Sequence, residues 1–329
     1  MKLKIVSIVM YSILLCVTLE ATSDHSARKS RSITELKPTA KIHVGATADW
    51  VAITSDSVWV GSTGPNAVHK ILRNTNQLIA TVALPGEPCA GLAIGFGSLW
   101  VPLCGDRPGL AKVDLASHKL MNVFNVSAVI EEGGITTSAD SVWLVVDKTG
   151  SLARIDPQSG VVRKIFHVAP GSYNPRYDDG LIWITRAEGS EVTALDATTG
   201  TIRATVPSGP KPRFLTAGAG AIWTLNQGDG TLTRIDTRSK KVTTIALGTP
   251  GHGGDISFGG GMIWTTVRNV PLSAIDATTD TLLCQWTGPG GDSLSVTDDA
   301  IWITDYHGGT ISRIELKDAL ADCKDSSGS

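Results

Sequence analysis

Short β-branched runs separated by glycine-containing turns extend along most of the chain, a pattern that is typical of an all-β fold. One of these runs recurs as an aliphatic residue followed by tryptophan, at spacings of 41, 43, 40, 40, 41 and 38 residues. The chain therefore contains seven copies of a unit of about forty residues. Their tryptophans are Trp59, Trp100, Trp143, Trp183, Trp223, Trp264 and Trp302.

Each copy has the same internal order. A short apolar strand with glycines precedes the tryptophan strand, and a third strand ends in a motif such as RID. A turn such as PQSG or ATTG then leads to a fourth strand, such as TIRATVPSG. Four hairpin-linked strands form one antiparallel sheet, which buries both of its faces only against neighbouring copies. Seven such sheets predict a seven-bladed β-propeller, in which the tryptophans pack between blades.

The turn after the third strand has its own signature. Five copies have aspartate at one position, where the side chain can accept hydrogen bonds from the amides of the turn. Gly160 and Gly200, four residues after such an aspartate, are expected to adopt a positive φ. The aspartates are Asp114, Asp156, Asp196, Asp236 and Asp276.

The last copy lacks a fourth strand. Residues 40–45, AKIHVG, precede the first complete copy and look like an unattached fourth strand. If they pair with the last sheet, they close the ring. We therefore expect a propeller over residues 40–316, preceded by a flexible lead-in over residues 22–39 and followed by a C-terminal tail over residues 317–329.

The N-terminus has the pattern of an export signal. A basic MKLK precedes an apolar run of signal-peptide length, so we expect a signal peptide over residues 1–21 and a secreted or periplasmic protein without a stable membrane span after cleavage. An uncleaved anchor is the alternative. Export favours disulfides, and the repeat places two cysteines at the same end of one sheet, so we predict Cys89–Cys104 and Cys284–Cys323. A zinc site is the less favoured alternative for these cysteines.

Composition adds little to this picture. A 42% hydrophobic chain with a formal net charge of −2 is large enough for a substantial core. The near-neutral charge gives no electrostatic reason to expect nucleic acid as a partner. We expect a monomer.

The unit AIWTLNQGDGTLTRIDTRSKKVTTIAL, residues 221–247, resembles the repeat of YVTN-type seven-bladed propellers. More distantly, residues 40–316 are similar to the streptogramin B lyase group. The resemblance implies the propeller fold but not one function, because propellers with unrelated activities share this architecture.

The loops of one propeller face carry most of the candidate chemistry. The connections from each fourth strand to the next first strand, and the loops after the tryptophan strands, converge around the channel mouth. Their arginines and carboxylates predict a binding or scaffold protein that holds a small anionic ligand, a glycan or a protein. Ordinary surface charge explains about half of them equally well. The candidate ligand-binding residues are Arg176, Arg186, Arg213, Asp255, Arg268 and Asp292, with Glu87, Glu131 and Glu132 on the same loops.

An enzyme is the alternative. The resemblance to the lyase group implies a metal-assisted lyase or hydrolase with a histidine as base, for which the candidate catalytic residues are His252, Asp305 and His307. Aspartate stands here in place of the glutamate of that group. A divalent metal would be the cofactor in this case, and no motif marks a serine nucleophile, a phosphate loop or any other cofactor.

Overall fold

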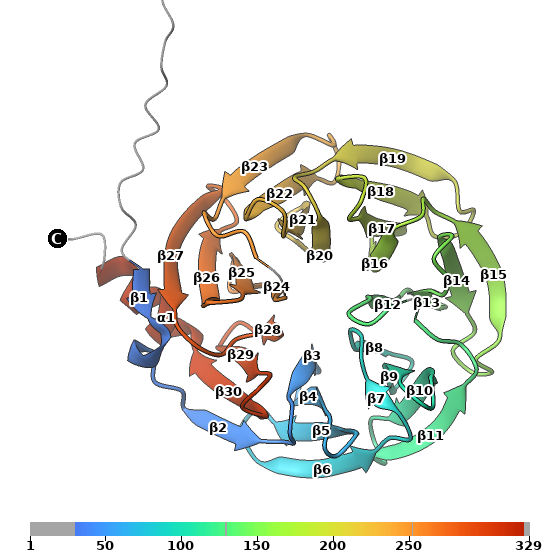
Figure 1. The fold of residues 1–329 in the computed structure, drawn as a ribbon, viewed down its shortest axis with the longest axis horizontal. Helices are drawn as coiled ribbons and strands as arrows, with labels where there is room; N and C mark the ends of the chain where they lie inside the picture. Colours follow the sequence, from blue (N-terminus) through green and yellow to red (C-terminus); the bar gives the residue numbers. More distant parts are fainter. Residues whose placement is uncertain (1–29, 129, 252, 326–329) are drawn as a thin grey trace, which may run out of the picture.

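The computed structural model describes residues 30–128, 130–251 and 253–325. They form seven sheets arranged in a ring around a central channel (Figure 1). Each sheet has four antiparallel strands, and two sheets carry an additional strand. The predicted all-β, seven-bladed propeller is confirmed.

In blades 1 to 6 the four main strands follow one another outward from the channel in chain order, and blades are numbered from the one that begins with β3. The inner strands are β3 (Asp49–Ile53), β8 (Ala93–Gly95), β12 (Ile135–Thr137), β16 (Ser172–Asp178), β20 (Pro212–Gly218), β24 (Asp255–Gly259) and β28 (Leu294–Val296). The second strands are β4 (Ser57–Ser62), β9 (Ser98–Cys104), β13 (Val142–Val145), β17 (Leu181–Arg186), β21 (Ala221–Asn226), β25 (Met262–Val267) and β29 (Ala300–Asp305).

The third strands are β5 (Ala67–Leu72), β10 (Gly109–Asp114), β14 (Ser151–Ile155), β18 (Glu191–Asp196), β22 (Thr231–Asp236), β26 (Val270–Asp276) and β30 (Thr310–Glu315). The outer strands are β6 (Leu78–Ala83), β11 (Lys119–Phe124), β15 (Val162–His167), β19 (Ile202–Pro207), β23 (Val242–Ala246), β27 (Thr281–Thr287) and, for blade 7, β2 (Ala40–His43). The short β7 (Glu87–Pro88) adds to β9 in blade 2.

The repeated tryptophans pack inside the ring. All seven lie on second strands and are at most 1% exposed. The basic residue of the third-strand motif lies opposite the tryptophan: Arg234 pairs across the strands with Trp223, and its guanidinium carbon lies 5.6 Å from the ring centroid. The same cation–π contact recurs in four other blades, at Lys70, Lys112, Arg154 and Arg313. The RID motif thus supplies a cap for the buried indole.

The turn aspartates act as predicted. Oδ1 of Asp156 accepts hydrogen bonds from the amides of Gln158 at 2.8 Å and Ser159 at 2.7 Å. The hydrogen bond from Ser159 is the main reason why the pKa of Asp156 falls to about 2. Gly160 and Gly200 have φ of 71° and 77°, so both adopt the expected left-handed conformation.

A strand from near the N-terminus closes the ring. β2 lies antiparallel to β30 and forms the outer edge of blade 7. The amides of Thr39 and Val44 continue this ladder, donating to the carbonyls of Arg313 at 2.8 Å and Gly309 at 2.9 Å. The predicted closure by residues 40–45 is confirmed, and both ends of the ring share one sheet.

Both ends of the described chain pack against blade 6. β1 (Ser30–Ser32) lies parallel to β27 as a fifth strand, and the 3-10 helix η1 (Ile33–Glu35) follows it. Helix α1 (Leu316–Asp325) lies beside them outside the ring (Figure 1). Of the helices in the described ranges, none has the length and apolar character needed to cross a membrane.

This arrangement differs from the expected flexible lead-in and polar tail. Leu36 and Ala319 bury apolar surface in one cluster with Trp286, a tryptophan outside the repeat. Asp322 of α1 accepts a hydrogen bond from Nε1 of Trp286 at 2.9 Å and forms an ion pair with Arg31. The described parts of residues 22–39 and 317–329 are therefore ordered by contacts with blade 6.

The structure contains both predicted disulfides. Cys89–Cys104 links the segment after β7 to the end of β9, and Cys284–Cys323 links β27 to α1. Their Cα–Cα separations of 5.8 and 5.5 Å lie within the normal range. The second disulfide anchors α1 to the ring.

We predict that Trp223→Ala lowers the free energy of unfolding by about 3–5 kcal/mol, because the lost indole leaves a cavity between blades. Equilibrium urea denaturation measures this change. Met121→Ala is the control, since Met121 is 60% exposed and its truncation is expected to cost under about 0.5 kcal/mol. Equal costs for the two variants would contradict a packing role for the tryptophan.

Candidate functional site

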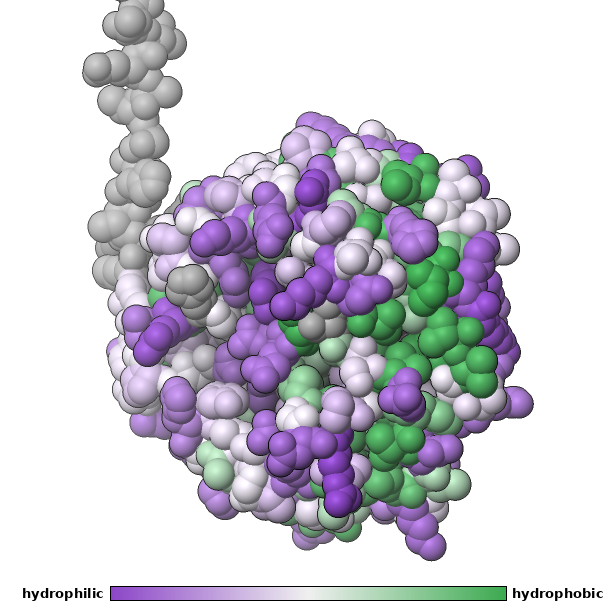
Figure 2. Space-filling view, turned by 45° about the vertical axis from the view of Figure 1, so that its right-hand side comes forward, coloured by the Kyte–Doolittle hydropathy of each residue, from purple (hydrophilic) through white to green (hydrophobic). Residues whose placement is uncertain are grey.

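The two sets of loops singled out in the sequence emerge on one face of the ring, which we call the upper face. Figure 2 shows it obliquely, with mainly hydrophilic residues over its middle and left, while the right of the view also takes in the outer rim of the ring, where hydrophobic residues gather. Two hollows lie along the channel axis. The upper funnel has a volume of about 600 Å³, and the lower channel, lined by the seven inner strands, has a volume of about 460 Å³.

Two inner strands bulge where they enter the channel. The pairing of β3 with β4 skips Trp50, and that of β20 with β21 skips Arg213 and Phe214. Trp50 has φ of 56°, a left-handed conformation that is rare for a bulky residue, and its amide donates to Oδ1 of Asp49 at 2.7 Å. A bulge changes the direction of the side chains next to it. The two bulges turn the rings of Trp50 and Phe214 into the channel.

Trp50, Leu92 and Phe214 form a plug across the channel. Trp50 belongs to blade 1 and Phe214 to blade 5, yet their ring centroids lie 6.1 Å apart, so this contact crosses the channel. Leu92 of blade 2 packs against the same cluster. Both aromatic side chains are only 6% exposed. The plug therefore divides the upper funnel, which Asp49 lines, from the part of the lower channel that holds Arg176.

Carboxylates predominate in the upper funnel. Among the described residues, its charged lining consists of Asp49, Glu87, Glu131, Glu132, Asp292 and Asp305 against Arg268 and His307. Tyr306 lines the same funnel. Burial, and then the charges of the nearby carboxylates Asp49, Asp292, Glu87 and Glu132, raise the pKa of its hydroxyl. A concave surface lined by one sign of charge concentrates ligands of the opposite sign. The funnel therefore favours cationic groups.

Asp49 and Asp292 form a carboxyl pair in the funnel wall. Their charges act on each other, and Asp49 accepts a hydrogen bond from Oγ of Ser293 at 2.6 Å. Burial and then the charge of Asp292 raise the pKa of Asp49 well above its usual value, and burial raises the pKa of Asp292. Raised pKa values favour the protonated, neutral form of these two carboxyl groups.

Asp255 lines the lower channel together with the plug residues. Its carboxylate accepts hydrogen bonds from the amides of Ile256 at 2.7 Å and Leu294 at 3.3 Å. Burial raises its pKa to about 7, so the group is about half ionised at neutral pH. In the parts of the chain that the structure describes, no Lys, Arg or His lies within ion-pair distance of it.

The four candidate arginines do not gather in the funnel. Arg186 pairs with Glu191 at 3.0 Å within blade 4, and Arg213 reaches Glu132 at 3.4 Å. Arg268 lines the upper funnel, whereas Arg176 lies in the lower channel. Two of the four are thus paired with carboxylates, and the other two lie in different hollows.

Of the predicted catalytic residues, Asp305 and His307 both line the upper funnel. His252 lies outside the described residues, so the trio remains a prediction. Within the described ranges, no three His, Cys, Asp or Glu side chains come together in a way that could hold a metal ion. We therefore derive no catalytic step through a metal.

The sequence did not single out the plug or the carboxyl pair. Trp50 was visible only as a tryptophan outside the forty-residue period, and Phe214 as the residue after the candidate Arg213. Asp49 gave no separate signal. Their importance arises from contacts between blades that are distant in sequence, which a repeat pattern does not report.

Comparisons with known proteins support the fold alone. Virginiamycin B lyase from Staphylococcus aureus, in selenomethionine form, superposes with a TM-score of 0.69 at 16% identity, covering 84% of this chain and 98% of that chain. BamB from Moraxella catarrhalis superposes with a TM-score of 0.63 at 12% identity, covering 85% of this chain and 100% of that chain. No family model and no curated protein matches the sequence. The YVTN-type repeat therefore remains an expectation.

We predict that Asp255→Asn changes how stability depends on pH. The pKa of Asp255 is about 7 in the folded chain, whereas an aspartate in an unfolded chain has a pKa of about 3.9. The folded state therefore binds the carboxyl proton more tightly. The contribution of Asp255 to stability is therefore present below pH of about 4 and falls by about 1.4 kcal/mol per pH unit up to about 7. The side chain of the asparagine does not titrate in this range, so the variant lacks this dependence on pH.

Urea denaturation between pH of about 4 and 8 tests this prediction. The stability of Asp255→Asn relative to the wild type should rise with pH and level off above pH 7. Asp298→Asn, at an exposed position, is the control and should show no such rise. A difference between Asp255→Asn and the wild type that does not vary with pH would refute the assignment.

Proposed function

We propose that this chain is an exported binding protein whose upper funnel holds a cationic group of a small molecule or of a protein partner. The observation that carries this proposal is the composition of the funnel lining, six carboxyl groups, of which Asp49 and Asp292 have raised pKa values, against one arginine and one histidine among the described residues. Export is supported by the apolar N-terminal segment and by the two disulfides, which are typical of oxidising compartments.

The same lining weighs against the anionic ligand that the arginine count suggests. Arg268 is the one arginine among the described lining residues of the funnel, and the neighbouring carboxylates would repel an anion. Tyr306, whose side chain is 38% exposed, adds an aromatic face of the kind that attracts cations. A glycan could donate hydrogen bonds from its hydroxyl groups to the carboxylates of the funnel. A glycan with a protonated amino group fits best, because its positive charge also attracts these carboxylates.

A metal-assisted lyase is the second candidate. The observation in its favour is that Asp49, Asp292 and His307 line the same funnel and that the charge of His307 acts on Asp292. Incubation of the full chain with virginiamycin B and a divalent metal, followed by mass spectrometry, tests this candidate. Conversion that is lost in His307→Ala would support the lyase, whereas unchanged substrate supports a binding role.

We predict that tetralysine binds the full chain and that tetraglutamate does not. Glu87→Gln should weaken tetralysine binding about two- to fivefold, because one partly exposed ion pair is lost. Glu188→Gln is the matched control, since Glu188 is exposed and is not among the lining residues of the funnel. Isothermal titration calorimetry measures both affinities.

The binding should also weaken with added salt, which screens charges on the protein surface. Equal affinities for the two peptides would overturn the proposed charge preference. An equal effect of Glu87→Gln and Glu188→Gln would place the binding outside the funnel.

A further inference from the structure

One level of the lower channel contains a single long charged side chain among small ones. The seven residues opposite the repeated tryptophans are equivalent in the repeat and belong to the inner strands. Six are alanine, serine or threonine, and only one has a long side chain. In chain order they are Ala52, Ala93, Thr136, Arg176, Thr216, Ser257 and Ser295. A single guanidinium therefore occupies a level of the channel that the other blades leave open.

The charge of Arg176 has no direct partner. Asp178 and Asp255 act on it electrostatically, but neither reaches the 4.0 Å limit of an ion pair, and no other described residue hydrogen-bonds its guanidinium. Arg176 is exposed to the channel, and the protein atoms that surround it lower the pKa of its guanidinium, which still remains protonated at neutral pH. Asp255, with a pKa of about 7, is about half neutral under the same conditions. The guanidinium of Arg176 thus faces the lower channel without an ion-pair partner among the described residues.

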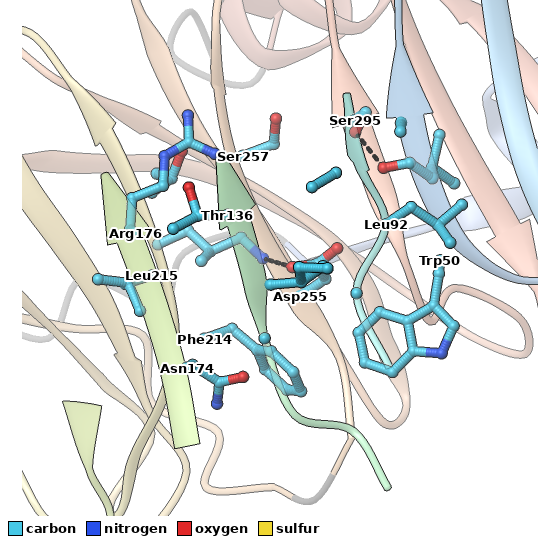
Figure 3. A pocket seen from close by; sticks show the side chains of 18 of the residues that line it. Trp50, Leu92, Thr136, Asn174, Arg176, Phe214, Leu215, Asp255, Ser257 and Ser295 are labelled. Atoms are coloured by element: carbon cyan, nitrogen blue, oxygen red, sulfur yellow. Dashed lines mark hydrogen bonds between the residues drawn. The ribbon is translucent and has the colours of Figure 1, made fainter. Parts of the chain in front are cut away.

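Two hydroxyl groups in the same hollow have a hydrogen left to donate. Oγ1 of Thr136 accepts from the amide of Tyr177 at 3.1 Å, and Oγ of Ser257 accepts from the amide of Val296 at 3.2 Å. No acceptor for either hydroxyl hydrogen is found in the described part of the chain. Figure 3 shows Arg176, Thr136 and Ser257 toward one end of the hollow, and Trp50 and Phe214 toward the other.

We propose that the lower channel is a second ligand site, in which Arg176 binds a small oxyanion with the hydroxyls of Thr136 and Ser257 as additional donors. The planar fork of a guanidinium matches two oxygens of a carboxylate or a phosphate. The plug separates this site from the acidic funnel, and its occupant enters from the lower face of the ring. The proposal does not depend on the function proposed for the funnel.

Isothermal titration of the full chain with inorganic phosphate, and separately with acetate, tests this proposal. The wild type should bind at least one of them saturably, and the tighter of the two identifies the preferred class of oxyanion. Arg176→Gln should weaken that binding about tenfold or more, because a charged hydrogen-bond donor is lost. Arg268→Gln, which removes the arginine of the upper funnel, should change it by less than about twofold.

Thermal denaturation provides a second readout that also reports folding. The bound anion should raise the unfolding midpoint of the wild type and leave that of Arg176→Gln unchanged. Arg176→Lys, which keeps the charge but loses the fork, should fall between the two in affinity. If Arg176→Gln does not fold, Arg176→Lys carries the comparison.

Two results would overturn the proposal. One is a folded wild-type chain without saturable binding of phosphate or acetate below about 10 mM. The other is a loss of binding in Arg268→Gln that equals or exceeds the loss in Arg176→Gln. In either case, intact binding of tetralysine would show that the funnel works as proposed and that only the second site is absent.

Discussion

The pairing of β2 with β30 is the interaction on which the rest of the structure depends. It places a strand from near the N-terminus in the same sheet as the last strands of the ring, so blade 7 packs against blade 1 as a complete sheet. β1 and α1 strengthen this closure from outside, since both are attached to blade 6, one by strand pairing and the other by the Cys284–Cys323 disulfide. The two ends of the ring are therefore held by backbone, apolar and covalent contacts together.

A closed ring makes contacts across the channel possible. The contact between Trp50 of blade 1 and Phe214 of blade 5 requires that the blades keep a fixed distance around the axis. It also requires the bulges that direct both rings inward. The resulting plug separates two different environments, a funnel lined mainly by carboxyl groups and a lower channel that contains the guanidinium of Arg176. Such a division provides two separate places for the two ligands proposed above.

The sequence predicted those features that repeat or that involve neighbouring strands. The spacing of Trp59 and its equivalents, the turn aspartates and the unattached strand at residues 40–45 all depend on local order, so the blade number and the closure could be inferred. The site could be predicted only in part. Asp292, Asp305, Arg268 and His307 line the funnel as their loop positions suggested. The plug, the carboxyl pair and the ion pair of Arg186 with Glu191 involve pairings that differ from blade to blade, and the repeat carries no information about them.

Hydrogen exchange of the backbone amides of β2 and its flanking residues tests the closure most directly. The amides of Thr39 and Val44 donate to the carbonyls of Arg313 and Gly309 on the last blade. If β2 closes the ring, these two amides should exchange as slowly as those of β29 and β30, through opening of the ring as a whole. Exchange of Thr39 and Val44 on the timescale of an unprotected chain, with the rest of blade 7 still protected, would contradict the closure and the funnel that depends on it.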